Sequence, residues 1–190
     1  MITRINDFIE RAYTNALEHG FHDEKTSFEH QMMLVISEIS EAVEADRKNH
    51  HSALDLFDHC FNDSGDFNNE FISFIKDDVE DELADVCIRL FDMCGYFGIE
   101  PYCSEKEIES LYTDWENEFG GLSFCEQCYH LVNLLTSCSV KDKHDIEVTF
   151  GAALSYIYYL CKSLNIDLVR HIELKMRFNA SRGYKHGKEY

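Results

Sequence analysis

Residues 77–93 read DDVEDELADVCIRLFDM, and this stretch decides the fold. Apolar residues recur from Leu83 to Leu90 at three- and four-residue spacing, which is the period of an amphipathic helix. Glu82 and Asp85 are three residues apart, so they share one face of that helix beside the apolar stripe. The stretch therefore predicts a long helix that carries carboxylates next to the core.

The rest of the chain shows the same helical period. A single proline, Pro101, and nine glycines among 190 residues favour long helices over a turn-rich β fold. We predict an all-α protein with a four-helix core and extra flanking helices. The expected core helices are 27–48, 70–97, 123–138 and 143–164, and the expected flanking helices are 2–19, 105–119 and 166–179.

The chain also resembles itself. Three segments recur in the same order: IERAYTNALEHG (9–20) as IESLYTDWENEFG (108–120), SFEHQMMLV (27–35) as SFCEQCYHLV (123–132), and LADVCIRLFDMCGYFGIE (83–100) as FGAALSYIYYLCKSLNID (150–167). We interpret this order as a degenerate duplication of helical hairpins within a single domain, 1–190, with halves at about 1–100 and 101–170. The first half holds an additional stretch, about 50–78, whose Asn, Asp, Ser and Gly residues predict a loop. It also holds aromatic residues, so the alternative is a segment that folds over another part of the chain.

A second acidic pair precedes the first. Glu38 and Glu41 are also three apart in a helical pattern with apolar neighbours, and no lysine or arginine lies near them along that helix. Carboxylates beside a core are costly without a partner, and a bound cation would relieve their repulsion. Oxygen-only ligands suit Mg²⁺, with Mn²⁺ as an alternative. The predicted ligands are Glu38, Glu41, Glu82 and Asp85, with Asp92 as a fifth; the alternative is a solvated acidic face.

The second half lacks these acids. By the repeat, Glu82 and Asp85 fall opposite Thr149 and Ala152, while the Glu38 pair falls near Leu135 and Cys138. We therefore expect one cation site per chain.

The C-terminal tail, 171–190, is the basic part of an acidic chain. Lys175, Asn179, Arg182 and Lys185 fall three or four residues apart, so one helical face could present them to phosphate groups. The alternative is a frayed terminus. His30 and Gln31 are candidates for binding a base.

Composition excludes some partners. The net charge of -19 argues against nucleic acid and anionic membranes as partners. Neither a signal-peptide pattern nor an uncharged apolar run of about 18 residues is present, so we expect a cytoplasmic protein with reduced cysteines. Cys125 and Cys128 form a lone CxxC near His130, which is insufficient to predict a zinc site.

The ExxE and ExxD motifs, Glu38–Glu41 and Glu82–Asp85, resemble those of the MazG-like and dimeric dUTPase superfamily of all-α nucleoside triphosphate pyrophosphohydrolases. The run 82–100 and the tail 171–190 are also similar to that family, and together the matches cover about half the chain. The departures are a long spacer between the motifs and a fused second half without the acids.

The resemblance implies a catalytic role for all four acids. Mg²⁺ would bind a nucleoside triphosphate, and water would attack the α-phosphorus to give a nucleoside monophosphate and pyrophosphate. It also implies a homodimer or homotetramer. Two alternatives stay open: a non-catalytic helical bundle that binds a nucleotide or cation, and a pure assembly module.

Overall fold

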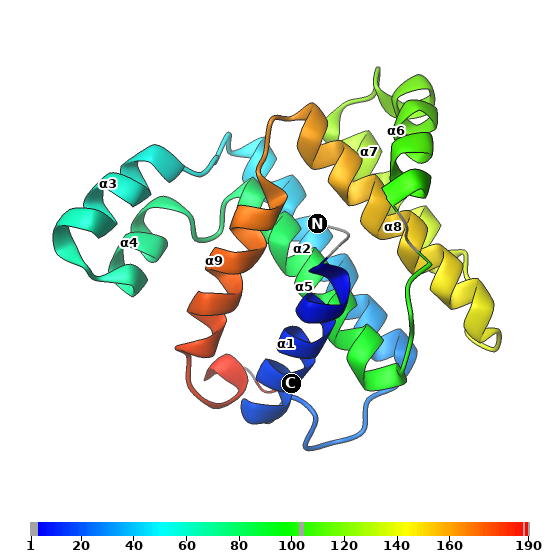
Figure 1. Ribbon diagram of the computed structural model, residues 1–190, viewed down its shortest axis with the longest axis horizontal. Coiled ribbons are helices and arrows are strands. Elements are labelled where there is room, and N and C mark those ends of the chain that lie inside the picture. Colours follow the sequence, from blue (N-terminus) through cyan, green and yellow to red (C-terminus); the bar gives the residue numbers. More distant parts are fainter. Residues whose placement is uncertain (1–3, 103–104, 188, 190) are drawn as a thin grey trace.

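The computed structural model describes residues 4–102, 105–187 and 189, and only the backbone of 63–64 and 105–110. Every regular element in this part of the chain is a helix, so the prediction of an all-α fold is confirmed (Figure 1). The helices are α1 (Ile5–Glu18), α2 (Phe28–Arg47), α3 (Leu54–Ser64), α4 (Phe67–Phe74), α5 (Val79–Phe97), α6 (Glu105–Phe119), α7 (Phe124–Thr136), α8 (Lys143–Ser163), α9 (Leu168–Ala180) and the short 3-10 turn η2 (Tyr184–Gly187).

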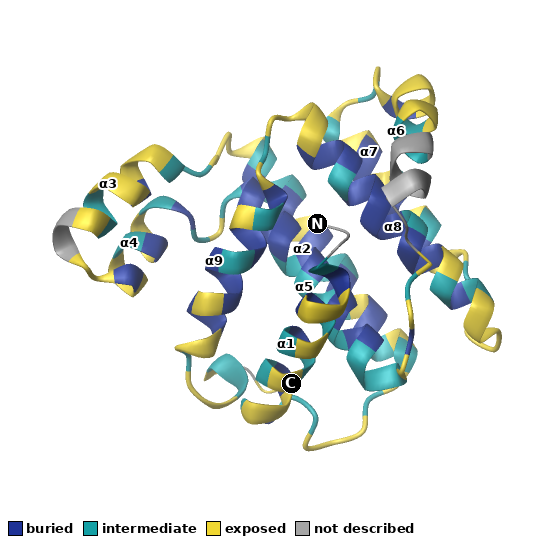
Figure 2. Cartoon of the chain, in the orientation of Figure 1, coloured by how far each residue is buried: buried dark blue, intermediate teal, exposed yellow. Residues whose placement is uncertain are grey.

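Helix α5 is the centre of the molecule. It packs against α1, α2, α8 and α9, and its apolar stripe, including Leu83, Val86 and Leu90, is completely buried. Each such side chain contributes about 1.5–3 kcal/mol through burial. The dark blue residues in Figure 2 gather along these facing helices. Residues 79–97 therefore form a core helix, which covers the C-terminal part of the predicted helix 70–97.

The helices expected in the four-helix core are in mutual contact. Helix α2 contacts α5, α5 contacts α8, α8 contacts α7, and α7 contacts α2. Helix α1 lies on the outside of this ring yet belongs to the same core, because Phe8 is completely buried and stacks on Phe91 with ring centroids 5.6 Å apart. In the second half, α6 packs on α8 as α1 packs on α5. The duplication itself stays a prediction.

Residues 50–78 are not the predicted loop. They hold α3 and α4, which form a hairpin that projects from the body (Figure 1). The hairpin has its own cluster, in which Phe57 and Phe71 are completely buried and Phe71 stacks on Phe178 of α9. Aromatic side chains in this stretch therefore form a small core against α9, despite the loop-like residues between them.

The predicted helix 70–97 is also interrupted. Helix α4 ends at Phe74, and α5 begins at Val79. Asp77 adopts a left-handed conformation (φ 64°), which a continuous helix cannot accommodate. Its backbone N–H donates to Asp81 Oδ2 at 3.0 Å, so the side chain of a residue in the next helix holds the break in place.

Candidate cation and anion site

Three of the predicted ligands meet between α2 and α5. Carboxylate oxygens of Glu38, Glu82 and Asp85 lie within 4.8 Å of one another. Glu38 is 4% exposed and Glu82 is 3% exposed, so both are held at the core side of their helices. The i,i+3 spacing of Glu82 and Asp85 puts both side chains on the face of α5 that meets α2. These three residues are called the carboxylate group below.

The fourth predicted ligand, Glu41, lies beside this group and not in it. Its side chain is exposed on α2, one turn after Glu38. Its negative charge nevertheless contributes to the raised pKa values of Glu38 and Glu82, after the larger effect of burial in each case. Glu41 is therefore near the group and accessible from solvent.

The expectation that these acids lack a protein counter-ion is wrong. Arg89, on α5, places Nε at 2.9 Å and Nη2 at 2.8 Å from Glu38 Oε1. Lys175, on α9, places Nζ at 2.8 Å from Asp85 Oδ2 and at 2.5 Å from Asp81 Oδ2. Lys175 is only 4% exposed. It lies inside the acidic cluster, whereas the sequence suggested that it reaches outward to phosphate.

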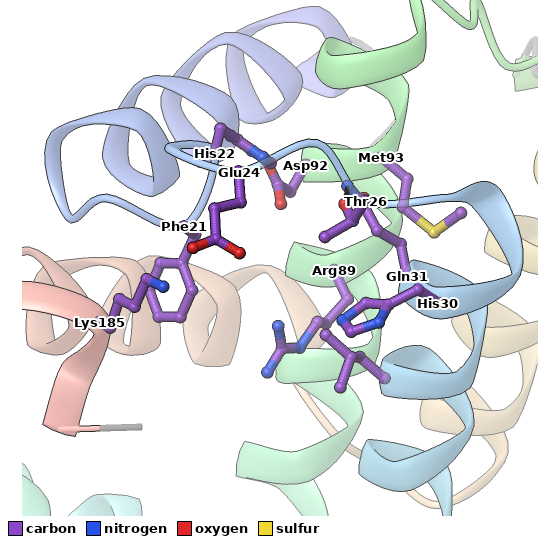
Figure 3. Close-up of a pocket in the computed structure, with 11 residues that line it drawn as sticks. Phe21, His22, Glu24, Thr26, His30, Gln31, Arg89, Asp92, Met93 and Lys185 are labelled. Atoms are coloured by element: carbon purple, nitrogen blue, oxygen red, sulfur yellow. Dashed lines mark hydrogen bonds and ion pairs between the residues drawn. The ribbon is translucent and has the colours of Figure 1, made fainter. Parts of the chain in front are cut away.

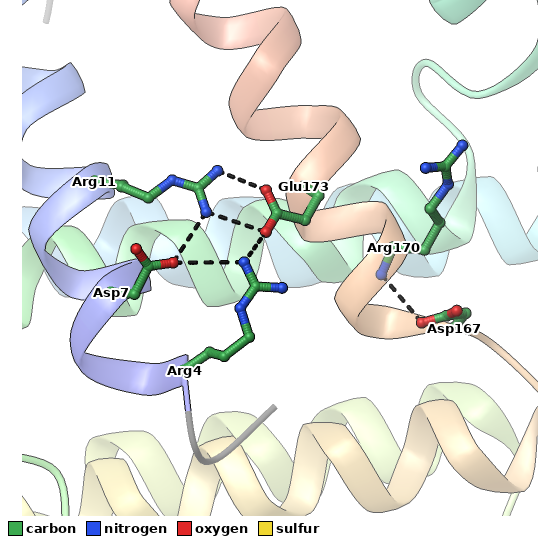
Figure 4. A network of polar contacts seen from close by, with 6 residues as sticks. All are labelled: Arg4, Asp7, Arg11, Asp167, Arg170 and Glu173. Carbon is green, nitrogen blue, oxygen red and sulfur yellow. Dashed lines mark hydrogen bonds and ion pairs between the residues drawn. The ribbon is translucent and has the colours of Figure 1, made fainter.

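Helix α9 is fixed to α1 by an ion-pair network, and this fixes Lys175. Glu173 accepts a hydrogen bond from Arg11, with Nη2 at 2.6 Å from Oε2, and another from Arg4 (Figure 4). Asp7 forms ion pairs with both arginines. These hydrogen bonds keep the pKa of Glu173 below its ordinary value. Networks of this kind hold geometry better than an isolated surface pair does.

The two cations do not balance the acids. Glu38, Asp81, Glu82 and Asp85 outnumber Arg89 and Lys175 by two. The carboxylate of Glu82 receives no hydrogen bond from any residue that the structure describes. Burial raises the pKa of Glu82 to about 9; Lys175 opposes this shift, and the charges of Asp85 and Asp81 add to it. An added divalent cation would relieve this excess of negative charge.

A second acidic group adjoins the first. Oxygens of Asp77, Asp81 and Glu82 also lie within 4.8 Å of one another, so Glu82 belongs to both groups. Burial raises the pKa of Asp81 to about 7, with Lys175 opposing the shift. Sequence reasoning missed Asp81, although its place one residue before Glu82 in a run of acids was a visible signal.

Asp92 does not join the carboxylate group. Its Oδ1 is paired with Nε2 of His22 at 2.7 Å. The His22 ring in turn stacks on Tyr96 with centroids 4.5 Å apart. Seven residues separate Asp92 from Asp85 along α5, so it lies two turns from the group. The structure therefore places the predicted fifth ligand in a separate pair.

Two adjoining pockets open beside the group. The first is lined by acids and by donors from α9 and the tail; it includes Glu38, Asp85, Arg89, Asp92, Asn179 and Arg182. The second is lined by His30, Gln31, Phe21 and Lys185, among others (Figure 3). Phe21, Arg89 and Asp92 line both pockets. The predicted base-binding pair, His30 and Gln31, thus lines a pocket next to the one lined by Asn179 and Arg182, whereas Lys175 lines neither pocket.

Asn179 lines the first pocket and has an unsatisfied side-chain atom. It is 8% exposed, and its Oδ1 is buried without a hydrogen-bond partner among the described residues. Asn179 follows Lys175 by four residues on α9, so both point to the same side. Orphaned buried oxygens are uncommon and often mark a missing water or ion.

The basic tail is folded, not frayed, over the residues that the structure describes; Lys188 and Tyr190 lie outside them. His19 bonds the backbone oxygen of Arg182 through Nε2 at 2.9 Å, and Arg182 Nη2 donates to the oxygen of His186 at 3.0 Å. Lys185 donates its backbone N–H to His19 at 2.8 Å. These bonds place Arg182 and Lys185 at the edges of the two pockets.

The weaker zinc signal finds no support in the geometry. Cys125 is exposed and Cys128 is buried, and neither belongs to a metal-capable group within the described residues. The cysteines that the structure describes are free thiols. None of the described helices combines the length and the apolar character needed to span a bilayer.

Comparison of the chain with family models, curated proteins and solved structures gives no match.

Proposed function

We propose that this chain is a Mg²⁺-dependent nucleoside triphosphate pyrophosphohydrolase, as the resemblance of its acidic motifs suggests. The observation that carries the proposal is the carboxylate group itself. Glu38, Glu82 and Asp85 are held together, and Glu38 and Asp85 line a pocket that is also lined by Asn179 and Arg182. Acids that bind a cation and donors that bind phosphate thus share one cavity, as a metal–triphosphate substrate requires.

The donor set fits magnesium. The three carboxylates offer only oxygen, and Asn179, whose Oδ1 is buried without a partner among the described residues, is one of the residues that line the adjacent pocket. Magnesium favours oxygen ligands and keeps part of its sphere for water and phosphate. Mg²⁺ held by Glu38, Glu82 and Asp85 would supply the Lewis acid that stabilises charge on the phosphates and acidifies a water molecule.

The protein's own residues divide the remaining work. The Arg182 guanidinium and the Asn179 amide are placed to donate hydrogen bonds to phosphate oxygens. Glu41, exposed beside the group, is the candidate that orients the attacking water and accepts its proton. The water oxygen bonds to the α-phosphorus, the bond from that phosphorus to the bridging oxygen breaks, and pyrophosphate leaves with the bond's electron pair. The nucleoside lies in the adjoining pocket beside His30 and Gln31.

The test is a screen of nucleoside triphosphates with Mg²⁺, in which monophosphate, pyrophosphate and orthophosphate are quantified separately. We expect monophosphate and pyrophosphate in equal amounts from at least one substrate, and none with EDTA. Glu44→Gln is a suitable control, since Glu44 lies on α2 but pairs with Arg47 and Lys48 at the surface. Orthophosphate as the main product, or no turnover of any substrate, would contradict the proposal.

A second candidate is a bundle that binds a nucleotide or cation without turnover. The ion pairs of Arg89 with Glu38 and of Lys175 with Asp85 favour it, because protein cations already neutralise part of the cluster. Tight nucleotide binding by calorimetry with no product over hours would select this candidate. A homodimer or homotetramer and a cytoplasmic location stay predictions that sedimentation and fractionation can test.

A further inference from the structure

Arg89 connects the cation site to the anion pockets. Both Nε and Nη2 contact a single atom, Glu38 Oε1, and Glu38 is a member of the carboxylate group. The Arg89 side chain is 24% exposed, so its guanidinium is neither buried in the core nor free in solvent. The same residue therefore reaches a candidate cation ligand and the open space beside it.

Arg89 also lines both pockets. Figure 3 shows Arg89 on α5 between His30 on one side and Lys185 on the other, and all three residues line the same pocket. A guanidinium has five N–H donors in a planar fork that matches two oxygens of a phosphate. The two contacts with Glu38 occupy only part of this fork.

A divalent cation and the Arg89 guanidinium cannot both bind Glu38 Oε1. Both are positive, and a divalent ion close to Oε1 would repel Arg89 and withdraw the charge that holds it. The displaced guanidinium then lies in a pocket that is also bordered by Arg182 and Asn179. An anion bound there would provide the partner that Glu38 no longer supplies.

We propose that Arg89 is a phosphate-binding residue that Glu38 holds back until a divalent cation takes that carboxylate. This inference deepens the proposed function and rests on it: the cation would bind first and the polyphosphate second. The simpler interpretation is that Arg89 only neutralises Glu38. The two differ in what happens when Glu38 loses its charge while no metal is present.

The experiment measures binding of inorganic tripolyphosphate by isothermal titration calorimetry in EDTA. In Glu38→Gln the Arg89 guanidinium loses its ionic partner and becomes available to the anion. We therefore expect tripolyphosphate to bind this variant at least about tenfold more tightly than the wild type, which is the gain in affinity that one charge-assisted hydrogen bond provides. The double variant Glu38→Gln/Arg89→Gln should return to wild-type affinity. Circular dichroism establishes that each variant is folded.

Two matched variants separate this effect from general electrostatics. Glu44→Gln removes a negative charge from the same helix, α2, that Arg89 does not contact, and it should change the affinity at most about threefold. Glu38→Asp keeps the negative charge but moves the carboxylate away from Arg89, so it should also tighten binding of the anion. This variant replaces Glu38→Gln in the test if Glu38→Gln does not fold.

The proposal is overturned if Glu38→Gln and Glu38→Asp bind tripolyphosphate no more tightly than Glu44→Gln. It is equally overturned if the gain in Glu38→Gln survives the loss of Arg89. Because the assay contains neither metal nor turnover, its outcome is independent of whether the wild type hydrolyses nucleotides. A hydrolase in which these variants behave alike would keep the proposed function and lose this inference.

Discussion

The helix pairs α2–α5 and α7–α8 are arranged alike but bury different kinds of side chain. In both pairs the two helices pack together, and a preceding helix packs on the second. Between α2 and α5 the chain buries Glu38 and Glu82 near Asp85. The corresponding stretch of α7 and α8 buries Leu135 and aromatic residues such as Tyr156, which packs edge-on against Trp115 at 5.2 Å.

Only the α2–α5 pair buries carboxylates, so only this pair carries a free-energy cost that packing alone does not explain. An apolar interface stabilises the fold directly, whereas buried carboxylates need partners and hydrogen bonds to be tolerated. Between α2 and α5, Arg89 and Lys175 supply only part of that compensation. The proposed bound cation would supply the rest.

The largest expected effect comes from removing the acid that both groups share. Glu82→Gln keeps the volume and removes the charge, so it should lower Mg²⁺-dependent pyrophosphate release at least about a hundredfold, because a bound metal supplies several kcal/mol of transition-state stabilisation. Steady-state product assays measure this. Unchanged turnover would show that the acidic half is no more catalytic than the apolar half.

The reverse substitution places an acid in the apolar half. Thr149 is buried, and the internal repeat aligns it with Glu82. We assign no counterpart of Arg89 or Lys175 in that half. Thr149→Glu should lower the free energy of unfolding by about 3 kcal/mol or more, because it buries an unpaired polar group. Urea denaturation measures it, with Thr149→Val as the control, expected within about 1 kcal/mol of the wild type. A fully stable Thr149→Glu would mean that this interface accepts acids without compensation.

A smaller effect concerns pH. The pKa of Glu82 is about 9 in the fold against an ordinary value of 4.5. The folded state therefore holds this proton more tightly, and the resulting stabilisation is complete below pH 4.5 and is lost as pH rises through 9. In EDTA, we expect the Tm of Glu82→Gln to exceed that of the wild type at pH 9 by at least about 3 °C, with little difference near pH 5. Mg²⁺ should restore the wild type at high pH; equal Tm values at both pH values would contradict the account of Glu82.

Much of the fold could be predicted from the sequence because apolar periodicity is a local signal. The ends of α6 and α8 fall within a residue of the expected bounds. The break before α5 could not be predicted this way, since it depends on the left-handed Asp77 and its bond to Asp81. The α3–α4 hairpin was missed because its aromatic residues pack on α9, about a hundred positions away in the chain.

The candidate site, like the fold, could be predicted where the signal is local and could not where it depends on distant residues. The i,i+3 spacing placed Glu82 and Asp85 together, and the pattern of α2 added Glu38. The partners were not visible, because Lys175 is 94 residues from Asp81 and Arg89 is 51 from Glu38. Sequence spacing identifies residues that share a helix face; it does not show which distant charge will lie against them.

The most direct measurement follows oxygen from water into product. The protein is incubated with Mg²⁺ and nucleoside triphosphates in ¹⁸O-enriched water, and the products are analysed by mass spectrometry. The account predicts one ¹⁸O atom in the nucleoside monophosphate and none in the pyrophosphate, with both products absent in Glu82→Gln. Label in pyrophosphate or orthophosphate, or the same products from Glu82→Gln, would contradict the claim that the carboxylate group directs attack at the α-phosphorus.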